Sequence, residues 1–294
     1  MYVSVATGLA AAFCWGTADY MSRSQSEVVG YFRTIIYSML FTLVTVLLLV
    51  PFISPSIEFP PYPVLALIVV GVLNFVAFVF LYRAFHTGVV SVVAPTVYTY
   101  PAVTAVLAVA ILGTSISSIQ VAAIAVIVLG VILLSTRFSE LRAYTHGTGA
   151  PKLTRGVGLA LGASVFFGMV YIGIGYAAPR VSVVLPVIFL RTIAVLAGLI
   201  LAPVLRQEVR PTRRVLSAKM IAMGVLEAFG FLAFTYGIAT AGGSLPIITA
   251  LSGMGGAVAT GYGLTFLKER LEFNQIVGVL LSLLGVFTLL YFGG

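Results

Sequence analysis

Residues 84–136 read AFHTGVVSVVAPTVYTYPAVTAVLAVAILGTSISSIQVAAIAVIVLGVILLST. Over its 53 residues, this stretch contains no Asp, Glu, Lys or Arg. An α-helix crosses a bilayer with about 20 apolar residues, so the stretch is long enough for two crossings. The turn-forming sequence Gly-Thr-Ser-Ile-Ser-Ser at 113–118 provides a break between them. We therefore predict two membrane-spanning helices here, and the same reasoning extends to the rest of the chain.

The composition of the whole chain is that of a membrane protein. Of its 294 residues, 61% are hydrophobic and 8% are charged, and the mean hydropathy is +1.16. A soluble domain has about 25% charged residues, so this chain cannot cover a globular surface with polar groups. The composition excludes a cytosolic enzyme, a secreted scaffold of disulfides (Cys14 is the only cysteine) and a nucleic-acid binder, despite a pI of 9.7. Residues 1–20 have no Lys or Arg ahead of their apolar run, so we expect a retained span and not a cleaved signal peptide.

Apolar segments between charged residues divide the chain into ten expected helices. These runs are continuous and do not alternate as the strands of a membrane barrel would. A second long segment, 220–267, has Glu227 as its only charge and is expected to break at Thr240-Ala-Gly-Gly-Ser244. We predict an all-α integral membrane protein with ten transmembrane helices, near residues 2–22, 28–50, 63–86, 89–112, 118–136, 155–177, 182–205, 216–240, 244–267 and 273–292.

Lys and Arg are concentrated in the connections on one side of the predicted bundle. That side has Arg23, Arg83, the loops at 137–155 and 206–219, Lys268 and Arg270. The other side has only Arg180. Because Lys and Arg favour the cytoplasmic side of a membrane, we expect the basic loops in the cytoplasm and both chain ends outside.

Short sequence matches recur in the same order in the two halves of the chain. Gly71-Val-Leu-Asn74 returns as Gly224-Val-Leu-Glu227, and the matched segments keep offsets of 152 to 158 residues. Residues 1–136 and 155–294 are thus expected to form two five-helix repeats, joined by the basic loop 137–154. An odd number of helices in each repeat makes the second copy enter the membrane from the opposite face. Such an inverted repeat is typical of secondary transporters, whose substrate site lies near the midplane between the repeats.

Several short motifs resemble those of a known family. Trp15-Gly16, an Arg early in the second expected helix, and Leu267-Lys-Glu-Arg-Leu271 followed by Gly278 and Gly285-Val286 resemble the EamA branch of the drug/metabolite transporter superfamily. In the first repeat, Gly113-Thr-Ser replaces the Lys/Arg-Glu pair of that motif. The resemblance covers the whole chain and is greatest to bacterial amino-acid exporters, including those for aromatic amino acids. It implies a multi-pass protein of the bacterial inner membrane, and it implies cytoplasmic chain ends, in conflict with the charge distribution.

Charged and polar residues inside the expected helices are candidates for function, because a charge at the bilayer centre costs about 2.5–3.5 kcal/mol on insertion scales. Glu227 could exchange a proton or bind a substrate ammonium, or it could be a neutral acid that bonds between helices. For its counterpart Asn74, a structural hydrogen bond is favoured over a functional role. Arg33 and Arg191 match in the second and seventh helices, where each could form a gate or bind a substrate carboxylate. Arg33 favours snorkelling to the headgroups.

Two expected helices are interrupted at corresponding places. The fourth contains Pro95 and Pro101, and the ninth contains Pro246 and several glycines. Matched Gly/Pro interruptions point to a transporter's binding site, although glycines also serve close helix packing. At the end of the first helix, Asp19 and Arg23 stand four residues apart, and we expect them to form an interfacial ion pair and not a binding site.

Aromatic residues gather at the depth of these interruptions. A tyrosine inside a bilayer needs a hydrogen-bond partner or water, which favours a central cavity over the lipid face, with interfacial or core positions as the alternative. We expect a cavity lined by the third, fourth, eighth and ninth helices, with aromatic faces from the first and sixth. The expected substrate-binding residues are Trp15, Asn74, Tyr82, Tyr98, Tyr171, Arg191, Glu227, Tyr236 and Ser244.

These patterns favour secondary transport, by alternating access, that exports amino acids or similar small amphipathic metabolites. A membrane enzyme would need clustered carboxylates, histidines or an activated nucleophile, and His86 and His146 are isolated. We therefore expect no catalytic residues, no metal site and no cofactor. Another metabolite, drug or sugar-phosphate carrier of the superfamily is the alternative, and a channel is less favoured. The expected partners are a small-molecule substrate and membrane lipid, with no nucleic acid, and the chain is expected to be a monomer.

Overall fold

The computed structural model describes residues 2–53, 60–112, 117–135, 155–240 and 245–292. Within these ranges every regular element is a helix. In chain order the elements are α1 (Tyr2–Val29), α2 (Tyr31–Ile53), α3 (Pro61–Thr87), α4 (Val90–Val97), α5 (Tyr100–Leu112), α6 (Ser118–Ser135), α8 (Val157–Ala177), the short 3₁₀ helix η1 (Ala178–Arg180), α9 (Leu185–Val204), α10 (Ala218–Thr240), α11 (Leu245–Ser252), α12 (Gly255–Thr265) and α13 (Phe273–Phe292). The all-helical fold class is confirmed.

Five segments are long and apolar enough to cross a membrane by themselves. They are Tyr31–Ile53, Pro61–Thr87, Val157–Arg180, Leu185–Val204 and Ala218–Thr240. Many large apolar side chains on the outside of the bundle are exposed, such as Leu48 at 68% and Ile200 at 68%. In a soluble protein this surface would be unstable in water, whereas a bilayer solvates it.

The first helix is longer than the sequence predicted, because nothing interrupts it before Gly30. That glycine has a φ of +87°, a left-handed conformation that favours glycine and ends the helix. α2 begins at the next residue, so the chain reverses with a single residue between two long helices.

The expected fourth and ninth helices are each broken in two, as their Gly/Pro content indicates. The first break separates α4 from α5 at Tyr98-Thr99, where the N–H of Tyr98 still donates to the carbonyl of Ala94 at 2.9 Å. Pro101 is the second residue of α5, a position where its missing N–H costs no helical hydrogen bond. The second break separates α11 from α12 at Gly253-Met254. Both breaks leave non-helical backbone inside the bundle.

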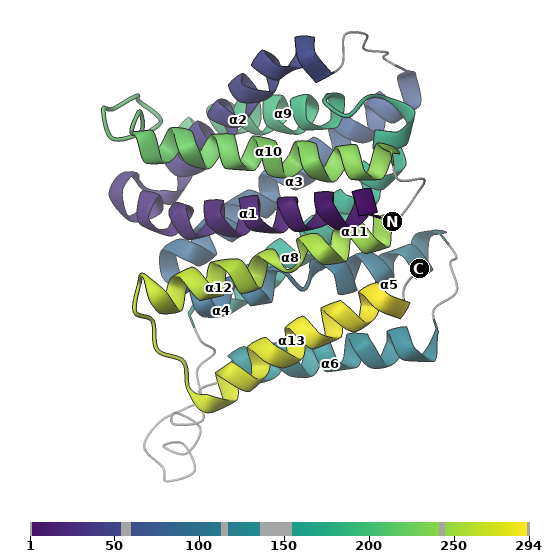
Figure 1. The fold of residues 1–294 in the computed structure, drawn as a ribbon. Helices are drawn as coiled ribbons and strands as arrows, with labels where there is room; N and C mark the ends of the chain where they lie inside the picture. Colours follow the sequence, from purple (N-terminus) through teal and green to yellow (C-terminus); the bar gives the residue numbers. More distant parts are fainter. Residues whose placement is uncertain (1, 54–59, 113–116, 136–154, 241–244, 293–294) are drawn as a thin grey trace.

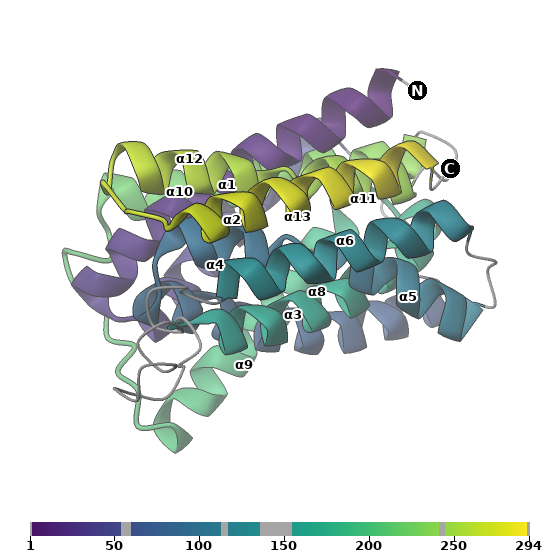
Figure 2. The same ribbon diagram turned by 90° about the horizontal axis from the view of Figure 1, so that it is seen from below.

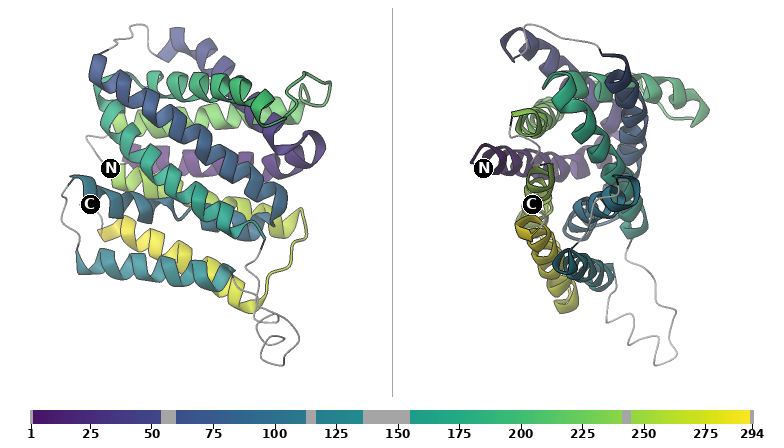
Figure 3. Two further views of the ribbon diagram at one scale, coloured as in Figure 1. Left: turned by 180° about the vertical axis from the view of Figure 1, so that it is seen from behind. Right: turned by 90° about the vertical axis from the view of Figure 1, so that its right-hand side faces the viewer.

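The two halves of the chain pack through each other. α1 of the first half lies against α10 of the second, and α3 lies against α8 in the reciprocal contact. The halves also exchange contacts between α2 and α9, between α1 and α12, and between α4 and α12. α6 and α13 lie side by side at one edge of the bundle, and α2 and α9 lie at the opposite edge (Figures 1 and 3). Helices from both halves therefore surround the centre.

The start of α1 and the end of α13 lie at one end of the bundle, and the α9–α10 connection lies at the other (Figures 1 and 2). At this second end, Arg23 forms an ion pair with Glu27 at 2.7 Å and donates to the carbonyl of Gly88 at 2.6 Å. The expected interfacial pair of Asp19 with Arg23 is wrong. The guanidinium instead caps the C-terminal end of α3, where the helix dipole favours a cation.

Glu269 of the Leu267-Lys-Glu-Arg-Leu271 motif connects the two halves at the same end. Its two carboxylate oxygens accept hydrogen bonds from the backbone N–H groups of Val90 and Ser91, each at 2.8 Å. These are the first N–H groups of α4, which have no partner inside the helix. The carboxylate both satisfies them and faces the positive end of the helix dipole.

Candidate functional site

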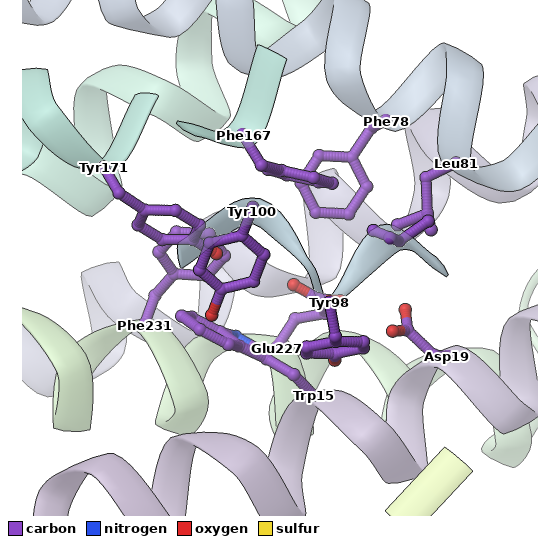
Figure 4. Close-up of a pocket in the computed structure, with 11 residues that line it drawn as sticks. Trp15, Asp19, Phe78, Leu81, Tyr98, Tyr100, Phe167, Tyr171, Glu227 and Phe231 are labelled. Atoms are coloured by element: carbon purple, nitrogen blue, oxygen red, sulfur yellow. The ribbon is translucent and has the colours of Figure 1, made fainter. Parts of the chain in front are cut away.

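A central cavity lies between helices of both halves. Its free volume is about 20 Å³, room for about one water molecule. Its walls come from α1, α3, the α4–α5 break, α8 and α10. The lining residues are Trp15, Asp19, Phe78, Leu81, Val97, Tyr98, Tyr100, Phe167, Tyr171, Glu227 and Phe231 (Figure 4).

Aromatic rings occupy most of the cavity wall. The ring of Trp15 lies 4.7 Å from that of Phe231 and 5.9 Å from that of Tyr171, measured between centroids. Tyr171 lies 4.4 Å from Tyr100, and Tyr100 lies 5.9 Å from Tyr98. The rings thus touch one another from four different elements. A ring-sized solute could enter only if these side chains or their helices moved apart.

Two glycines give these rings their positions. A Cβ built on Gly255 of α12 would lie 2.6 to 2.8 Å from atoms of the Tyr98 ring and its hydroxyl. A Cβ on Gly230 of α10 would lie 2.6 Å from Cδ1 of Trp15. Both separations are shorter than a van der Waals contact, so any larger residue would displace the ring. The glycine-rich character of α12 therefore has a specific packing role at the cavity.

Glu227 belongs to a buried polar cluster behind the cavity wall. The guanidinium of Arg191 on α9 donates from Nη2 to Oε2 of Glu227 at 3.0 Å, and from Nη1 to Oδ1 of Asn74 at 3.2 Å. The side chains of Arg191 and Glu227 are 0% and 2% exposed. A charge this deep in a membrane protein requires a partner, and this pair supplies one. Of the three residues, only Glu227 lines the cavity.

Aromatic rings hold Arg191 from two sides. Its Cζ lies 4.2 Å from the centroid of Phe231 and 4.9 Å from that of Phe78, distances at which a ring face attracts a cation. Nη1 also donates to the sulfur of Met39. Both rings line the cavity with their other edges, so the arginine fixes part of the cavity wall.

Asp19 is the second carboxylate of the cavity and is 4% exposed. Its side chain lies next to that of Tyr98 (Figure 4). Among the residues that the structure describes, no Lys or Arg stands within ion-pair distance of Asp19. The two carboxylates of the cavity therefore have different surroundings: one is neutralised by an arginine and the other is not.

The expected site residues fall into five groups. Trp15, Tyr98, Tyr171 and Glu227 line the cavity, whereas Asn74 and Arg191 lie behind it. Tyr82 is fully buried outside the cavity, with its hydroxyl 3.5 Å from that of Ser38. Tyr236 is 45% exposed on the outside of the bundle, so its placement at the cavity is corrected. Ser244 lies outside the described residues.

Arg33, the other arginine of the matched pair, is not at the centre. Its Nε donates to the carbonyl of Glu208 at 3.0 Å, and its guanidinium forms an ion pair with the carboxylate of the same residue. This contact joins the start of α2 to the α9–α10 connection. Because the two chemically alike arginines differ so much in depth, only Arg191 belongs to the region of the site.

Sequence reasoning missed Asp19, Tyr100 and five apolar residues of the cavity wall. Asp19 stands four residues after Trp15, and residues i and i+4 share a helix face, so this spacing was the available signal. The same geometry excludes Tyr236, which follows Glu227 by nine residues, two and a half turns, and so faces the opposite way. Phe78, Phe167 and Phe231 carried no signal by themselves, because phenylalanines are frequent throughout the chain.

A second hollow lies between α5, α6 and α8. It has a free volume of about 300 Å³ and is lined by Thr99, Ala102, Val103, Ile127, Val128, Ile132, Leu161, Ser164 and Val165. None of these side chains is charged, and Val128, Ile132 and Val165 are exposed on the outer surface. Its polar side chains, Thr99 and Ser164, are hydrogen-bonded to each other at 3.1 Å. In the described part of the chain, no group of three His, Cys, Asp or Glu side chains is placed to hold a metal ion.

Comparisons with known proteins agree with this architecture. A solved structure titled "Crystal structure of protein" is 16% identical to this chain, covers 97% of it and 95% of its own length, and superposes with a TM-score of 0.67. At that identity the likeness establishes the fold alone. No curated protein matches the chain. The model of the EamA-like transporter family matches twice, over residues 3–136 and 154–291, so each half of the chain is one copy of the family's repeat. The chain belongs to the EamA-like transporter family.

Proposed function

We propose that this chain is a secondary transporter that exports small amphipathic metabolites across the bacterial inner membrane. The solute has a ring-sized apolar part and an amino group, the class that includes aromatic amino acids. The observation that carries the proposal is the central cavity, in which seven aromatic rings and two carboxylates meet between helices of both halves. Aromatic faces bind apolar groups and attract an ammonium group. A buried carboxylate attracts the ammonium group more strongly than a ring does.

The mechanism we propose is alternating access. Ten membrane crossings in two inverted five-helix repeats would place the two breaks, between α4 and α5 and between α11 and α12, on opposite sides of the cavity. The reciprocal packing of α1 with α10 and of α3 with α8 supports such a pseudo-two-fold relation. Because the rings of Trp15, Tyr171 and Tyr100 touch one another, the cavity is closed in this structure. Rocking of the repeats would part the rings toward one face and then toward the other.

A sugar-phosphate carrier is less well supported by the same residues. A phosphate would need guanidinium or ammonium groups on the cavity wall. Arg191 is bonded to Glu227, Asn74 and Met39 and is not a lining residue, and the lining contains two carboxylates. An anion would therefore meet repulsion where a cation meets attraction.

Transport by purified protein in liposomes tests the proposal. We expect uptake of at least one radiolabelled member of a panel of aromatic and aliphatic amino acids and amines, with and without an imposed proton gradient. Tyr98→Ala should raise the concentration for half-maximal uptake, because it removes a ring face and the hydroxyl beside Asp19. Tyr236→Ala is the matched control, since Tyr236 is exposed away from the cavity. No uptake of any compound, or equal effects of the two variants, would contradict the proposal.

A further inference from the structure

The strongest unexplained feature of the cavity is the carboxylate of Asp19. It is 4% exposed, and the nearest basic residue along its own helix, Arg23, is engaged elsewhere. The guanidinium of Arg23 is bonded to Glu27 and to the carbonyls of Phe85 and Gly88. Tyr98 lies next to Asp19 in the cavity wall and brings no charge (Figure 4). A carboxyl group buried in a membrane is stable either as the neutral acid or beside a cation, so a ligand with a positive charge is the partner that would bind its ionised form.

The remaining charges of the site do not balance Asp19. Arg191 and Glu227 form a pair at 3.0 Å and neutralise each other. The hydrogen bond that Arg191 donates to Oδ1 of Asn74 keeps the arginine behind the wall. With this pair counted as neutral, Asp19 is the one acidic group of the described lining that has no basic partner.

The aromatic rings of the cavity also favour a cation as the ligand. Trp15, Tyr98, Tyr100 and Tyr171 line the same space as Asp19, and aromatic faces attract organic cations more than they attract neutral groups. We propose that the cavity takes an organic monocation with an aromatic or similarly apolar body, and that Asp19 binds its ammonium group. This inference rests on the proposed function and narrows the solute from amphipathic metabolites in general to amines.

A zwitterion and an anion fit the same wall less well. Their carboxylate would need a donor of positive charge on the wall, and no Lys or Arg is among the residues that line the cavity. The carboxylate would also face Asp19 or Glu227. The ammonium group of an amino acid would still bind Asp19, so the free carboxylate is what distinguishes a disfavoured ligand from a favoured one.

The single tryptophan of the chain makes this inference directly measurable. Trp15 is the only tryptophan and lines the cavity, so the indole fluorescence of the purified protein reports what happens there. Four ligands share a phenyl ring without an indole and differ in charge: 2-phenylethylamine, phenylalanine, 3-phenylpropionate and 2-phenylethanol. We expect the amine to change the fluorescence at the lowest concentration and 3-phenylpropionate at the highest.

Asp19→Asn isolates the charge, because the amide has nearly the size and shape of the carboxylate and stays neutral. It should weaken binding of 2-phenylethylamine by about tenfold or more, as expected for loss of a charged hydrogen bond, and leave 2-phenylethanol unchanged. Glu27→Gln is the matched control, since it removes a carboxylate of the same helix that lies outside the cavity, and it should change neither ligand. If Asp19→Asn does not fold, the four-ligand series on the wild-type protein decides the question by itself.

Three results would overturn the inference, and they have different consequences for the proposed function. Phenylalanine that binds as tightly as 2-phenylethylamine, or Asp19→Asn that binds the amine like the wild type, would reject an amine site and leave transport through this cavity intact. No fluorescence response to any of the four ligands would reject the cavity as a site for ring-bearing solutes, and the proposed function with it.

Discussion

The guanidinium of Arg191 and the carboxylate of Glu227 form an ion pair at 3.0 Å between α9 and α10. From the sequence alone, Glu227 is a candidate to bind a substrate ammonium and Arg191 is a candidate to bind a substrate carboxylate. Their direct contact changes that interpretation. Each is the other's partner, so the pair fixes the second repeat internally and leaves the recognition of charge to another residue.

Breaking this pair should destabilise the protein asymmetrically. Glu227→Leu leaves an arginine that stays charged, and an unpaired buried charge costs about 3–5 kcal/mol. Arg191→Met should cost less, because the remaining glutamate can take up a proton. The double variant Arg191→Met/Glu227→Leu should regain most of the stability that Glu227→Leu loses. Thermal unfolding in detergent measures all four proteins, and strictly additive losses would show that the two residues do not interact.

Gly255→Ala should weaken solute binding through the ring of Tyr98. The added methyl group would lie 2.6 Å from a ring carbon, so the ring must move into the cavity or α12 must shift. Gly261→Ala, on the same helix, meets nothing within 4 Å and is the control. We expect a higher concentration for half-maximal transport in Gly255→Ala and wild-type behaviour in Gly261→Ala. Equal behaviour of the two variants would contradict the packing role.

Glu269→Gln should loosen the first turn of α4. The substitution removes the charge from the carboxylate that accepts from Val90 and Ser91, a capping interaction that contributes about 0.5–2 kcal/mol. Glu208→Gln is the comparison, because the side chain of Glu208 is 79% exposed and its pair with Arg33 contributes about 0–1 kcal/mol. Thermal unfolding should show the larger loss for Glu269→Gln. The reverse order would mean that this capping contact contributes little to stability.

The sequence was sufficient to predict where the helices lie along the chain. It was not sufficient to predict which side of each helix faces the cavity. The long uncharged runs and the Gly/Pro interruptions located helices and both breaks to within a few residues, apart from the C-terminal end of α1. Hydropathy has no direction around a helix that is apolar on all sides, so Tyr236 could not be told from a cavity residue by composition. Helical spacing would have separated it from Glu227.

Asp19 shows why pairwise rules failed at the site itself. Its spacing from Arg23 fits an ion pair along one helix, and nothing in the local sequence says that Arg23 has a better partner. The end of α3, far away in sequence, offers that partner through the carbonyls of Phe85 and Gly88. Because of this long-range packing, Arg23 does not pair with Asp19, and Asp19 lines the cavity. The local sequence around Asp19 and Arg23 does not show this.

Membrane orientation should follow the basic residues. The α9–α10 connection contains Arg206, Arg210, Arg213 and Arg214, and it lies at the end of the bundle opposite to the start of α1 and the end of α13 (Figure 1). Because Lys and Arg favour the cytoplasmic side, both chain ends should lie outside. A cysteine added after Gly294, in a Cys14→Ser background, should react with an impermeant thiol reagent applied from the periplasm. If a cysteine in the 137–155 loop reacts from the periplasm instead, the orientation is the reverse of the one expected.

Access to the cavity from both faces of the membrane is the central claim, and labelling of Leu81→Cys measures it most directly. Leu81 lines the cavity and is 3% exposed, and Cys14→Ser leaves no other thiol in the chain. A small impermeant thiol reagent should label this cysteine in right-side-out vesicles and, separately, in inside-out vesicles, and a transported solute should slow both reactions. Labelling from one face only, or labelling that the solute does not slow, would contradict alternating access through this cavity.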